Sequence, residues 1–516
     1  LANGVLTSTV VGDIALIFAT LFVILNYILP IAKLRQSSSN LEKQVGLGSF
    51  KKHWFFGHLR LFPPLEHGLL KRAQRTIQTP AWVTTWFGPL VSEATTHHSE
   101  TAITLLASSA PKNEYVYKFL RPWLGDGLLV SNGKKWMRNR HLLTPAFHFS
   151  ILKPYAEISN NCIKTMIEKW TTKTNVAFDI YKDVNSMTLD TMLQCAMSFK
   201  IEGLKERQKN TYLQAVRDLS TLTMARISNP LLHIEWIFWR SSTGRKYKAA
   251  LEIVHQQTKQ VIRERKEELK KARSETAQVT RKGKYIDFLD ILLHTKDENG
   301  IGLSDVEIEN EVDTFLNEGH DTTASGISWS LYMLAQHPEY QQKCRDELEE
   351  VLKDKEDIDW SDLTKLQYLT MCIKETLRIR PPVPAISRQL DQPLTFKSKT
   401  HNVPPTTLAK GSFAGVQIFS LHRNVHVWEE PEVFNPDRFT QDNIKKRSPH
   451  AFLPFSAGSR NCIGQNFAMN EMKIAVGQII RKYELYIDDD TPDTVMETAL
   501  VLRSTNGIMI KIRHLH

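Results

Sequence analysis

The chain has 516 residues, of which 41% are hydrophobic and 24% are charged, and its formal net charge is +10 at pH 7. This composition excludes the fibrous and intrinsically disordered classes and is that of a globular protein. The positive charge favours acidic partners or an anionic membrane surface. Because the chain has no long run of lysine and arginine and no interleaved array of aromatic residues, the sequence predicts no nucleic-acid binding.

An almost wholly apolar segment lies near the amino terminus, from Ile14 to Ala32. At about 1.5 Å per residue, a helix of this length just crosses a hydrocarbon layer of about 30 Å. We therefore expect residues 1–34 to form a membrane anchor, and the positive charges after it to keep the remaining chain in the cytosol. The alternatives are a signal peptide, for which the segment is long, and a buried core helix, although it has no polar face.

Residues 35–50 are polar and rich in glycine and serine, which is typical of a linker. The folded body is expected to comprise residues 51–516. Most of it has apolar residues at helical spacing, whereas strand-like alternation is short and occurs near residues 393–396 and 500–513. A charged stretch at 263–284 predicts a solvated helix end and loop. The sequence therefore predicts a mainly α body with small β-sheets.

Two helices are delimited by the chemistry of their ends. A capping box begins the first at Ser304, and apolar periodicity continues to His337, where Pro338 prevents continuation. This helix is roughly 50 Å long and has glycines and threonines at its centre, which favours a function there because they are poor helix formers. The second helix is expected from Ser361 to the residue before Pro381.

The five cysteines are an odd number, widely spaced and without a C-x-x-C pair, which predicts free thiols in a reducing compartment. The last of them, Cys462, lies in the segment FSAGSRNCIG at 455–464, just before a predicted helix. Backbone N–H groups and the positive end of that helix can stabilise its thiolate, and a thiolate can bind iron. A buried structural cysteine is the alternative for such a residue taken alone.

The segment at 455–464 resembles the haem-binding loop of the cytochrome P450 superfamily, F-x-x-G-x-R-x-C-x-G. Two further motifs are similar to that superfamily: residues 375–378 match E-x-x-R, and residues 435–439 match its P-E-R-F element with aspartate in place of glutamate. The resemblance covers about residues 51–516. It implies the cytochrome P450 fold in a single catalytic domain, with haem b as the cofactor and Cys462 as the axial ligand of the haem iron.

The same resemblance gives a structural role to Glu375, Arg378 and Arg438. Glu375 and Arg378 are i, i+3 neighbours on a helix, so they can form an ion pair that Arg438 joins from a distant loop. Taken alone, an E-x-x-R pair would be no more than a surface ion pair.

Four residues match positions that bind the haem propionates in that superfamily: Trp136, Arg140, Arg388 and Arg460. Trp136 and Arg140 share one helix face at i, i+4, so the indole N–H and the guanidinium can both donate to a carboxylate. For any one of these arginines alone, a surface position is the alternative.

The centre of the long helix, residues 318–323, resembles the oxygen-activation segment of the superfamily. In that role Gly319 would leave room for O₂, Thr322 would place a hydroxyl near the iron, and Asp321 would admit protons from the cytosolic side. The alternative for Thr322 is a hydroxyl that donates to a carbonyl of its own helix.

The longer segment 311–323 resembles the signature of family 4 of the superfamily, whose members mostly hydroxylate fatty acids at the chain end. The resemblance implies an ester between Glu318 and a haem methyl group, so that haem b would be covalently attached. A glutamate paired with a nearby cation is the alternative. We expect monooxygenation of a fatty acid or a related lipid with O₂ and NADPH.

The chain has no G-x-G-x-x-G motif and no evident flavin domain, so its electrons must come from a partner. The resemblance implies NADPH-cytochrome P450 reductase, with cytochrome b5 as a second candidate, and a location on the endoplasmic reticulum membrane with one span and a cytosolic catalytic domain. Five cations near the haem-binding helix and loop are expected to meet an acidic reductase, with anionic lipid as the alternative partner. They are Lys134, Lys135, Lys445, Lys446 and Arg447.

Two other functions fit the same motifs. One is peroxide rearrangement by a haem-thiolate enzyme, which has less use for Asp321 and Thr322. The other is a non-catalytic haem sensor or ligand carrier. Consumption of NADPH with and without a flavoprotein reductase separates the three hypotheses.

Overall fold

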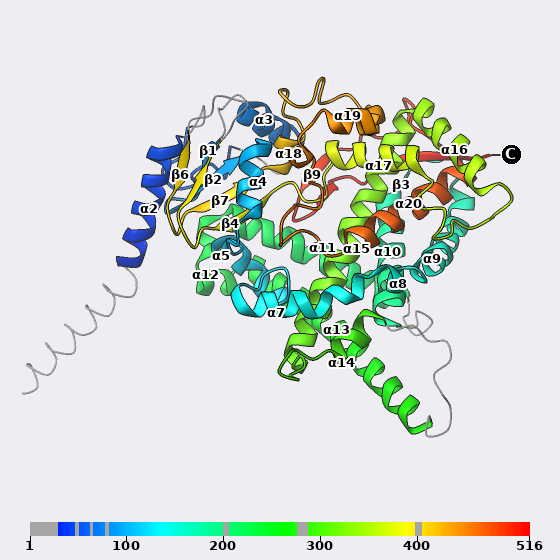
Figure 1. Cartoon of the computed structure of the whole chain (residues 1–516), viewed down its shortest axis with the longest axis horizontal. Helices are drawn as coiled ribbons and strands as arrows, with labels where there is room; N and C mark the ends of the chain where they lie inside the picture. Colours follow the sequence, from blue (N-terminus) through cyan, green and yellow to red (C-terminus); the bar gives the residue numbers. More distant parts are fainter. Residues whose placement is uncertain are drawn as a thin grey trace, which may run out of the picture.

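The computed structural model shows a mainly helical body with small β-sheets (Figure 1), which confirms the predicted fold class. The described residues are 29–46, 51–61, 66–77, 82–199, 206–275, 287–397 and 405–515. Within these ranges no helix is long and apolar enough to cross a membrane. Of the predicted apolar span at 14–32, only the last four residues, 29–32, are among the described residues.

The segment predicted as a linker differs from the prediction up to Val45. Helix α2 (Leu29–Val45) includes it and packs along strand β2 (Val91–Thr96) of the sheet on the left of Figure 1. The hydroxyl oxygen of Ser38, which is buried, accepts a hydrogen bond from the N–H of Ser92 at 2.9 Å, and Leu41 is buried as well. Ser38 and Leu41 are i, i+3 neighbours, so one helix face is tied to the sheet despite the polar composition.

The helical body is arranged around α15 (Asp305–Gln336), against which α10, α17 and α20 pack (Figure 1). The longer helices of the body are α3 (Glu66–Ile77), α4 (Ser99–Ala107), α7 (Gly133–Leu143), α9 (Tyr155–Trp170), α10 (Ile180–Met197), α11 (Glu206–Ser228), α13 (Ser242–Glu275), α16 (Pro338–Leu352), α17 (Gln367–Ile379) and α20 (Gln465–Lys482). Short helices that bear on the sites below are α5 (Glu114–Tyr117), η2 (Lys118–Leu120), η6 (Pro230–His233), α12 (Glu235–Arg240), α14 (Phe288–His294) and α19 (Gln441–Lys445).

The largest sheet has the order β1-β2-β7-β4, with β2 and β7 parallel and the other neighbours antiparallel. Its other strands are β1 (Trp82–Phe87), β4 (Ile386–Gln389) and β7 (Phe413–Val416). The smaller sheets are β3 (Phe178–Asp179) with β11 (Met509–His514) and β8 (Tyr483–Tyr486), β5 (Leu394–Phe396) with β6 (Thr406–Leu408), and β9 (Met496–Thr498) with β10 (Leu502–Ser504). The predicted strand segments correspond to β5 and to β10 with β11.

Helix α15 has the ends that the sequence predicts. The Ser304 hydroxyl accepts from the N–H of Glu307 at 3.3 Å, and the Glu307 carboxylate accepts from the N–H of Ser304 at 2.9 Å, which completes the capping box. The helix ends with His337 as its C-cap, and Pro338 begins α16. Two local signals, a reciprocal cap and a proline, are sufficient here.

Helix α17 begins at Gln367, so the predicted start at Ser361 was wrong. Its first free N–H groups are capped from another helix: the Glu347 carboxylate of α16 accepts from Tyr368 at 2.6 Å and from Leu369 at 3.0 Å. The start of α17 is therefore decided by a tertiary contact, which the local sequence does not contain.

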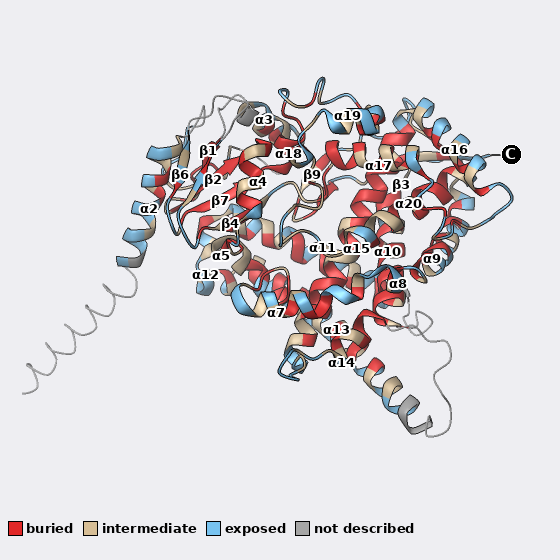
Figure 2. Cartoon of the chain, viewed as in Figure 1, coloured by how far each residue is buried: buried red, intermediate tan, exposed pale blue. Residues whose placement is uncertain are grey.

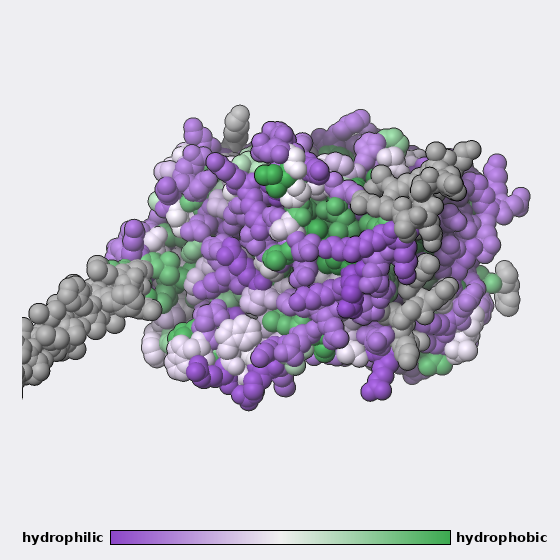
Figure 3. Space-filling model, turned by 90° about the horizontal axis from the view of Figure 1, so that it is seen from below, coloured by the Kyte–Doolittle hydropathy of each residue, from purple (hydrophilic) through white to green (hydrophobic). Residues whose placement is uncertain are grey.

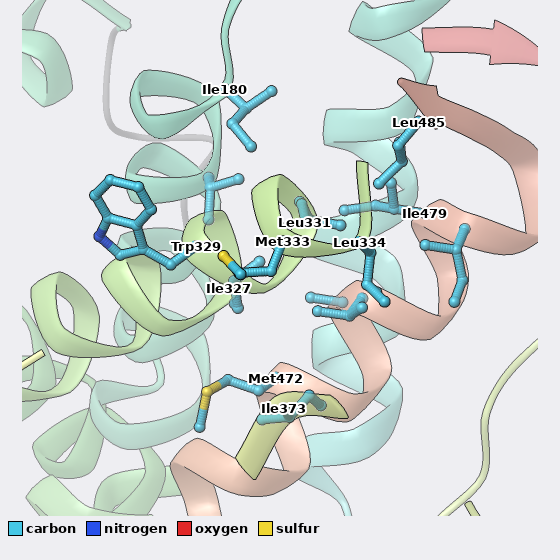
Figure 4. Packing of buried hydrophobic residues seen from close by; sticks show 14 of the residues in the cluster. Ile180, Ile327, Trp329, Leu331, Met333, Leu334, Ile373, Met472, Ile479 and Leu485 are labelled. Carbon is cyan, nitrogen blue, oxygen red and sulfur yellow. The ribbon is translucent and has the colours of Figure 1, made fainter. Parts of the chain in front are cut away.

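Buried residues gather on α10, α15, α17 and α20 at the centre of the body (Figure 2). In the close-up of this core, side chains of α15 lie among those of α10, α17, α20 and β8 (Figure 4). Gly326 permits the approach of α20, because a Cβ there would lie 2.6 Å from the sulfur of Met472. These contacts hold the centre of α15 in one position.

The charged stretch at 263–284 is helical up to Glu275, the end of α13. It is less solvated than predicted, because the Arg265 guanidinium is buried and lies 2.6 Å from the carboxylate of Asp290 on α14. Residues 276–286 are outside the described ranges. Seen from below, the side on which α13 and α14 lie, the molecule has mostly hydrophilic residues around an apolar area near its centre (Figure 3).

Candidate active site around Cys462 and the centre of α15

The segment 455–464 forms a tight loop before α20. The N–H of Cys462 donates to the carbonyl oxygen of Phe455 at 2.9 Å. Gly458 has a φ of +75°, and a Cβ at this position would lie 2.0 Å from the carbonyl oxygen of Leu106 in α4. The loop needs glycine here, because any other residue would strain the backbone and overlap α4.

The Cys462 side chain is exposed and lines an open recess of about 460 Å³. The recess is formed by α7, the turn after it and the cysteine loop, through Arg140, Thr144, Pro145, Phe147, His148, Asn461, Cys462, Ile463 and Gln465. Protein atoms surround the other sides of the thiol, so burial raises the pKa of Cys462 to about 11, while the Gly464 N–H lowers it. A metal cation reverses this balance, because coordination holds a thiol deprotonated. The other four cysteines are buried.

One face at the centre of α15 is accessible within a stretch that is otherwise buried. Glu318, Gly319 and Thr322 are partly exposed, whereas the remaining residues from 311 to 331 are buried. Glu318 and Thr322 are i, i+4 neighbours, so both lie on this accessible face. The Thr322 hydroxyl donates to the carbonyl oxygen of Glu318 at 2.6 Å, which is the alternative left open by the sequence. Its oxygen keeps lone pairs that can accept a hydrogen bond from a ligand.

The carboxylate of Glu318 forms no ion pair with any described residue. Burial raises its pKa to about 7; the charge of Lys112 lowers this pKa and that of Asp321 raises it. Gly319 has a packing role, because a Cβ there would lie 2.6 Å from Cε of Met192 on α10. The glycine that the sequence analysis assigned to O₂ access thus allows α10 to approach α15.

Asp321 lies on a different side of α15 from Glu318 and Thr322. Its carboxylate accepts from the Tyr181 hydroxyl of α10 at 2.6 Å and is ion-paired with Arg503 of β10. Burial by itself raises the pKa of Asp321, but Arg503, His320 and the Tyr181 hydrogen bond together lower it. Asp321 is 2% exposed. A role in admitting protons therefore requires this buried pair to open.

We predict that Arg503→Met destabilises the protein by about 3–5 kcal/mol at neutral pH, because it leaves the Asp321 carboxylate buried without a counter-charge. In the native protein the pKa of Asp321 is lowered, so its ion pair stabilises the fold at neutral pH, and this stability is lost only when the pH falls far enough to protonate the carboxylate. In the variant, burial raises this pKa instead, so stability should fall as the pH rises above the unfolded value of about 4. Denaturant midpoints at acidic and neutral pH measure both effects.

The control for this variant is Arg513→Met, which removes an exposed ion pair with Glu484 at 3.1 Å. An exposed pair contributes about 1 kcal/mol or less, so the control should unfold near the native midpoint. Equal destabilisation of the two variants, or a midpoint of Arg503→Met that does not depend on pH, would contradict the prediction.

Trp136, Arg140 and Arg460 come together beside the cysteine loop. The Arg460 guanidinium lies 3.9 Å from the centroid of the Trp136 ring and donates to two oxygens of residues 131–132. Arg140 donates to the backbone and side-chain oxygens of Asn461, both at 3.0 Å. Arg140 therefore braces the residue that precedes Cys462.

A second group of cations consists of Arg388 on β4 and Lys112, which form a β-bridge with each other. Arg388 is 2% exposed, and its Nη1 has no hydrogen-bond partner among the described residues. Lys112 is 8% exposed, and its Nζ lies 3.4 Å from the Tyr117 hydroxyl. Burial, followed by the charges of Arg388 and Arg460, lowers the pKa of Lys112 well below its usual value.

Burial likewise lowers the pKa of Arg460 to about 9, and Arg388 adds to this effect. Buried cations that repel one another indicate a region built to bind an anionic group, since an uncompensated buried charge is costly. Lys112 and Tyr117 were missed by the sequence analysis. Lys112 is a single lysine in a turn, and the residues that give it meaning are far away in the sequence.

Glu375, Arg378 and Arg438 are brought together as one buried ionic cluster. The Arg378 guanidinium is bidentate to the Glu375 carboxylate, with Nε and Nη2 both at 2.8 Å from its oxygens. Arg438 Nε lies 3.3 Å from the same carboxylate, which also accepts from the N–H of Asn435 at 2.9 Å. Arg378 further donates to the carbonyl oxygens of His422 and Pro431. The cluster ties α17 to the chain that leads into the cysteine loop.

A family model described as Cytochrome P450 matches residues 47–512. The chain belongs to the cytochrome P450 family. Cytochrome P450 4F2 of Homo sapiens is 41% identical over 474 residues, which cover 90% of this chain and 89% of that protein. Cytochrome P450 4B1 of Rattus norvegicus is 43% identical over 465 residues (90% and 89%). Leukotriene-B4 omega-hydroxylase 3 of Mus musculus is 42% identical over 475 residues (90% and 88%). The predicted resemblance, including its family 4 type, is confirmed.

This cytochrome P450 is therefore a haem-thiolate monooxygenase with haem b as its cofactor, and it takes electrons from a redox partner. The residues of the site fit that cofactor. Cys462 presents an accessible thiol, and the unpartnered Arg388 Nη1 with the nearby Lys112 and Arg460 matches a group that carries two carboxylates. When bound, haem supplies the iron at which O₂ is reduced, with electron density from the thiolate, as is general for cytochromes P450.

Proposed function

We propose that this cytochrome P450 hydroxylates fatty acids or related lipids at the terminal carbon. The observation that carries the proposal is Glu318, which lies on the accessible face of α15 one turn before Thr322. The relatives support it, because one of them is named a leukotriene-B4 omega-hydroxylase. NADPH-cytochrome P450 reductase supplies the electrons, and cytochrome b5 is a second candidate donor.

In this proposal each residue of the site has one task. Cys462 would supply the thiolate that binds the haem iron. Thr322 orients the proton donor, and Asp321 passes protons once its pair with Arg503 opens. The haem propionates are held by Trp136, Arg140, Arg388 and Arg460, joined by Lys112, and the cofactor-side core is held by Glu375, Arg378 and Arg438.

Glu318 would attach the cofactor through an ester between its carboxylate and a haem methyl group. This ester would replace one C–H bond of the methyl group by a C–O bond to Glu318, with the proton released and O₂ as the two-electron oxidant. The ester stiffens the cavity. Stiffness matters because hydrogen is harder to abstract from the terminal carbon than from the neighbouring carbon. For each ~1.4 kcal/mol of this difference, the positioning of the substrate must favour the terminal carbon by a factor of ten in rate.

We predict that after turnover haem stays with the denatured wild-type polypeptide but is released from Glu318→Ala. The terminal-to-internal ratio of products should fall by up to about tenfold, a loss of ~1.4 kcal/mol in positioning. Because the pKa of Glu318 is raised to about 7, its carboxylate, the form that attacks, increases as the pH rises. The esterified fraction per turnover should therefore be larger at about pH 8 than at about pH 6. Chromatography under acid denaturing conditions measures that fraction.

The matched control is Glu318→Gln, which keeps the size of the side chain but has no carboxylate. It should release haem as Glu318→Ala does, which separates the ester from packing. Complete dissociation of haem from the turned-over wild-type protein would refute the ester and leave the monooxygenase intact.

We further propose that the protein works on the endoplasmic reticulum membrane with a cytosolic catalytic domain, 51–516, behind an anchor at 1–34. Exposed apolar side chains support contact with lipid: Leu231, Ile234 and Trp236 of the η6–α12 region are 49%, 45% and 63% exposed. Trp54 is 81% exposed and lies near these residues. Gly88 shows this proximity, because a Cβ at Gly88 would lie 3.0 Å from Pro230, next to Leu231, and 3.7 Å from the carbonyl oxygen of Phe55, next to Trp54. A clustered apolar surface of this kind is typical of a membrane contact.

We predict that Lys445→Glu with Lys446→Glu raises the KM for the reductase several-fold at low salt, with a smaller effect at high salt, because screening shortens to about 8 Å at physiological ionic strength. Both lysines are exposed, and so is Lys134, whose charge is reversed in a separate variant, Lys134→Glu. Of the other two cations in this prediction, Lys135 pairs with Asp126 at 2.9 Å and Arg447 lies 4.3 Å from the centroid of the Trp428 ring.

Lys259→Glu on α13, at the opposite edge of Figure 1 from α19, is the control for charge reversal. Reductase kinetics measured at several ionic strengths test whether the α19 lysines contact the reductase. A KM for the reductase that neither salt nor the α19 reversal changes would place docking elsewhere.

The proposed function is tested with purified enzyme, reductase and NADPH on a mixed panel of fatty acids, with products identified by mass spectrometry. Terminal hydroxylation that depends on both NADPH and reductase supports it. Conversion of a lipid hydroperoxide without NADPH would favour peroxide rearrangement, and haem binding without any turnover would favour a sensor.

A further inference from the structure

Two cations meet among aromatic rings where α5 and η2 pack against α11, η6 and α12. Lys118 Nζ lies 4.5 Å from the centroid of the Tyr115 ring and 5.0 Å from that of Phe119. The Arg226 guanidinium lies 3.8 Å from the Phe238 centroid and 4.8 Å from that of Phe119. Cations stack on aromatic faces in this way at sites that are partly withdrawn from water.

No acidic side chain in the described ranges forms an ion pair with Lys118. Lys118 also forms no hydrogen bond with any residue in these ranges. The two acidic residues whose charges act on Lys118 are themselves paired, Glu114 with Arg121 at 2.7 Å and Glu235 with Arg226 at 2.6 Å. Burial lowers the pKa of Lys118 and Arg226 lowers it further, whereas Glu235 and Glu114 oppose this shift without reversing it. The cluster therefore carries one uncompensated positive charge.

Arg226 is fixed in place behind Lys118. It is 1% exposed; its Nε donates to the Leu232 carbonyl oxygen at 3.0 Å, and its Nη1 has no hydrogen-bond partner among the described residues. An unpartnered donor in a buried guanidinium is costly, so its retention indicates a use. Arg226 raises the positive potential at Lys118, while its own Nε and Nη2 remain bound to the Leu232 carbonyl oxygen and to Glu235.

The cluster is connected to the proposed active site through one short segment. The hydroxyl of Tyr117, the residue before Lys118, lies 3.4 Å from Lys112 Nζ. Burial raises the pKa of Tyr117; the charge of Arg388 lowers this pKa and that of Glu318 raises it. Tyr115 and Phe119, on either side, face the cluster: the Tyr115 hydroxyl is 2.8 Å from Nδ1 of His233. Residues 112–119 thus have one set of side chains, Lys112 and Tyr117, that interacts electrostatically with Glu318 of α15, and another at Lys118.

The surface next to the cluster is apolar. Leu231, Ile234 and Trp236 surround His233 in the chain and are exposed. A molecule that binds both here and at α15 must have a long apolar body and one anionic end. A terminal hydroxylase needs its substrate held at the end opposite to the one that reacts, because positioning decides which carbon is attacked.

We propose that Lys118, reinforced by Arg226, binds the carboxylate of the lipid substrate and thereby places its methyl end at the active site. This inference rests on the proposed function, since only a substrate attacked at its far end requires such an anchor. Arg226 acts as a positioning residue through Lys118. The ligand is a long-chain monocarboxylate.

The test compares palmitic acid with methyl palmitate, which has the same chain without the charge, in neutral detergent. Binding to the holoenzyme is followed by the substrate-induced change in haem absorbance. Lys118→Met should weaken binding of the acid about 10- to 100-fold, the range for a charge-assisted hydrogen bond, and leave the ester unchanged. Lys118→Arg should restore most of the affinity for the acid. For the acid, KM should rise more than kcat falls.

Lys246→Met, which removes an exposed lysine of α13, is the control for charge in general. Equal losses for acid and ester in Lys118→Met, or none, would overturn the anchor. An effect seen only in vesicles of anionic phospholipid and absent in neutral detergent would assign Lys118 to the membrane instead, which also overturns it. If the wild type oxidises palmitate only at internal carbons, the proposal of terminal hydroxylation is wrong. The ratio of acid to ester affinity still tests separately whether Lys118 binds the carboxylate.

Discussion

Cys462→Ala should abolish the red-shifted Soret band of the reduced, carbonyl-bound protein and all NADPH-dependent hydroxylation. The expected loss is complete because a methyl group cannot coordinate iron, and no second thiol can replace it: the other four cysteines are buried. The band is characteristic of thiolate-ligated haem, so absorbance spectra of the reduced protein with carbon monoxide report ligation directly. Haem content, measured separately, shows whether the variant still holds the cofactor through its propionates.

Cys195→Ala is the matched control. Cys195 is 0% exposed, and burial raises the pKa of its thiol well above the usual value, so it cannot take the place of Cys462 as an iron ligand. This variant should keep the band. A red-shifted band in Cys462→Ala would remove the central assignment, whatever the activity of that variant.

The second large effect is expected from Glu375→Ala. Glu375 is fully buried and neutralises Arg378 through two hydrogen bonds of 2.8 Å. Its removal leaves a buried guanidinium without a counter-charge, which typically costs about 3–5 kcal/mol. Natural proteins are stable by only about 5–15 kcal/mol, so we expect most of the variant to lose haem or fail to fold at physiological temperature. Unfolding of the holoprotein by urea, followed by circular dichroism and haem absorbance, measures the loss.

Glu375→Gln keeps the shape and one acceptor, so its loss should be intermediate, which separates charge from packing. Glu350→Ala, at an exposed position of α16, should change the free energy of unfolding by no more than about 0.5 kcal/mol. If Glu375→Ala unfolds as the native protein does, the cluster is not what holds α17 to the chain before the cysteine loop.

Local sequence was sufficient where a structure depends on neighbours along the chain. The ends of α15 follow from one capping box and one proline, and the i, i+4 spacing places Glu318 and Thr322 on one face. The turn of the cysteine loop is also local, because the positive φ of Gly458 and the hydrogen bond from Cys462 to Phe455 lie within ten residues, whereas the close approach of Gly458 to α4 is a tertiary contact. The motifs at 318–323 and 455–464, which lie in these elements, resembled the family that the comparisons then confirmed.

Other features depend on segments that only folding brings together. An isolated bridge to strand β4 places Lys112 next to Arg388, although Lys112 has no signal of its own in the sequence. The start of α17 is set by Glu347 from α16. Helix α2 is held by Ser38 against Ser92, although its composition is that of a linker.

Asp321 shows the same division at a single residue. The sequence by itself determined that a carboxylate precedes Thr322 at the centre of a long helix. Only the tertiary structure decided that this carboxylate is ionised and closed off, because Tyr181 and Arg503 reach it from α10 and β10. The physical reason is general: helix caps and helix faces arise from interactions over a few residues, whereas the charge state of a buried group depends on desolvation and on partners that are distant in the chain.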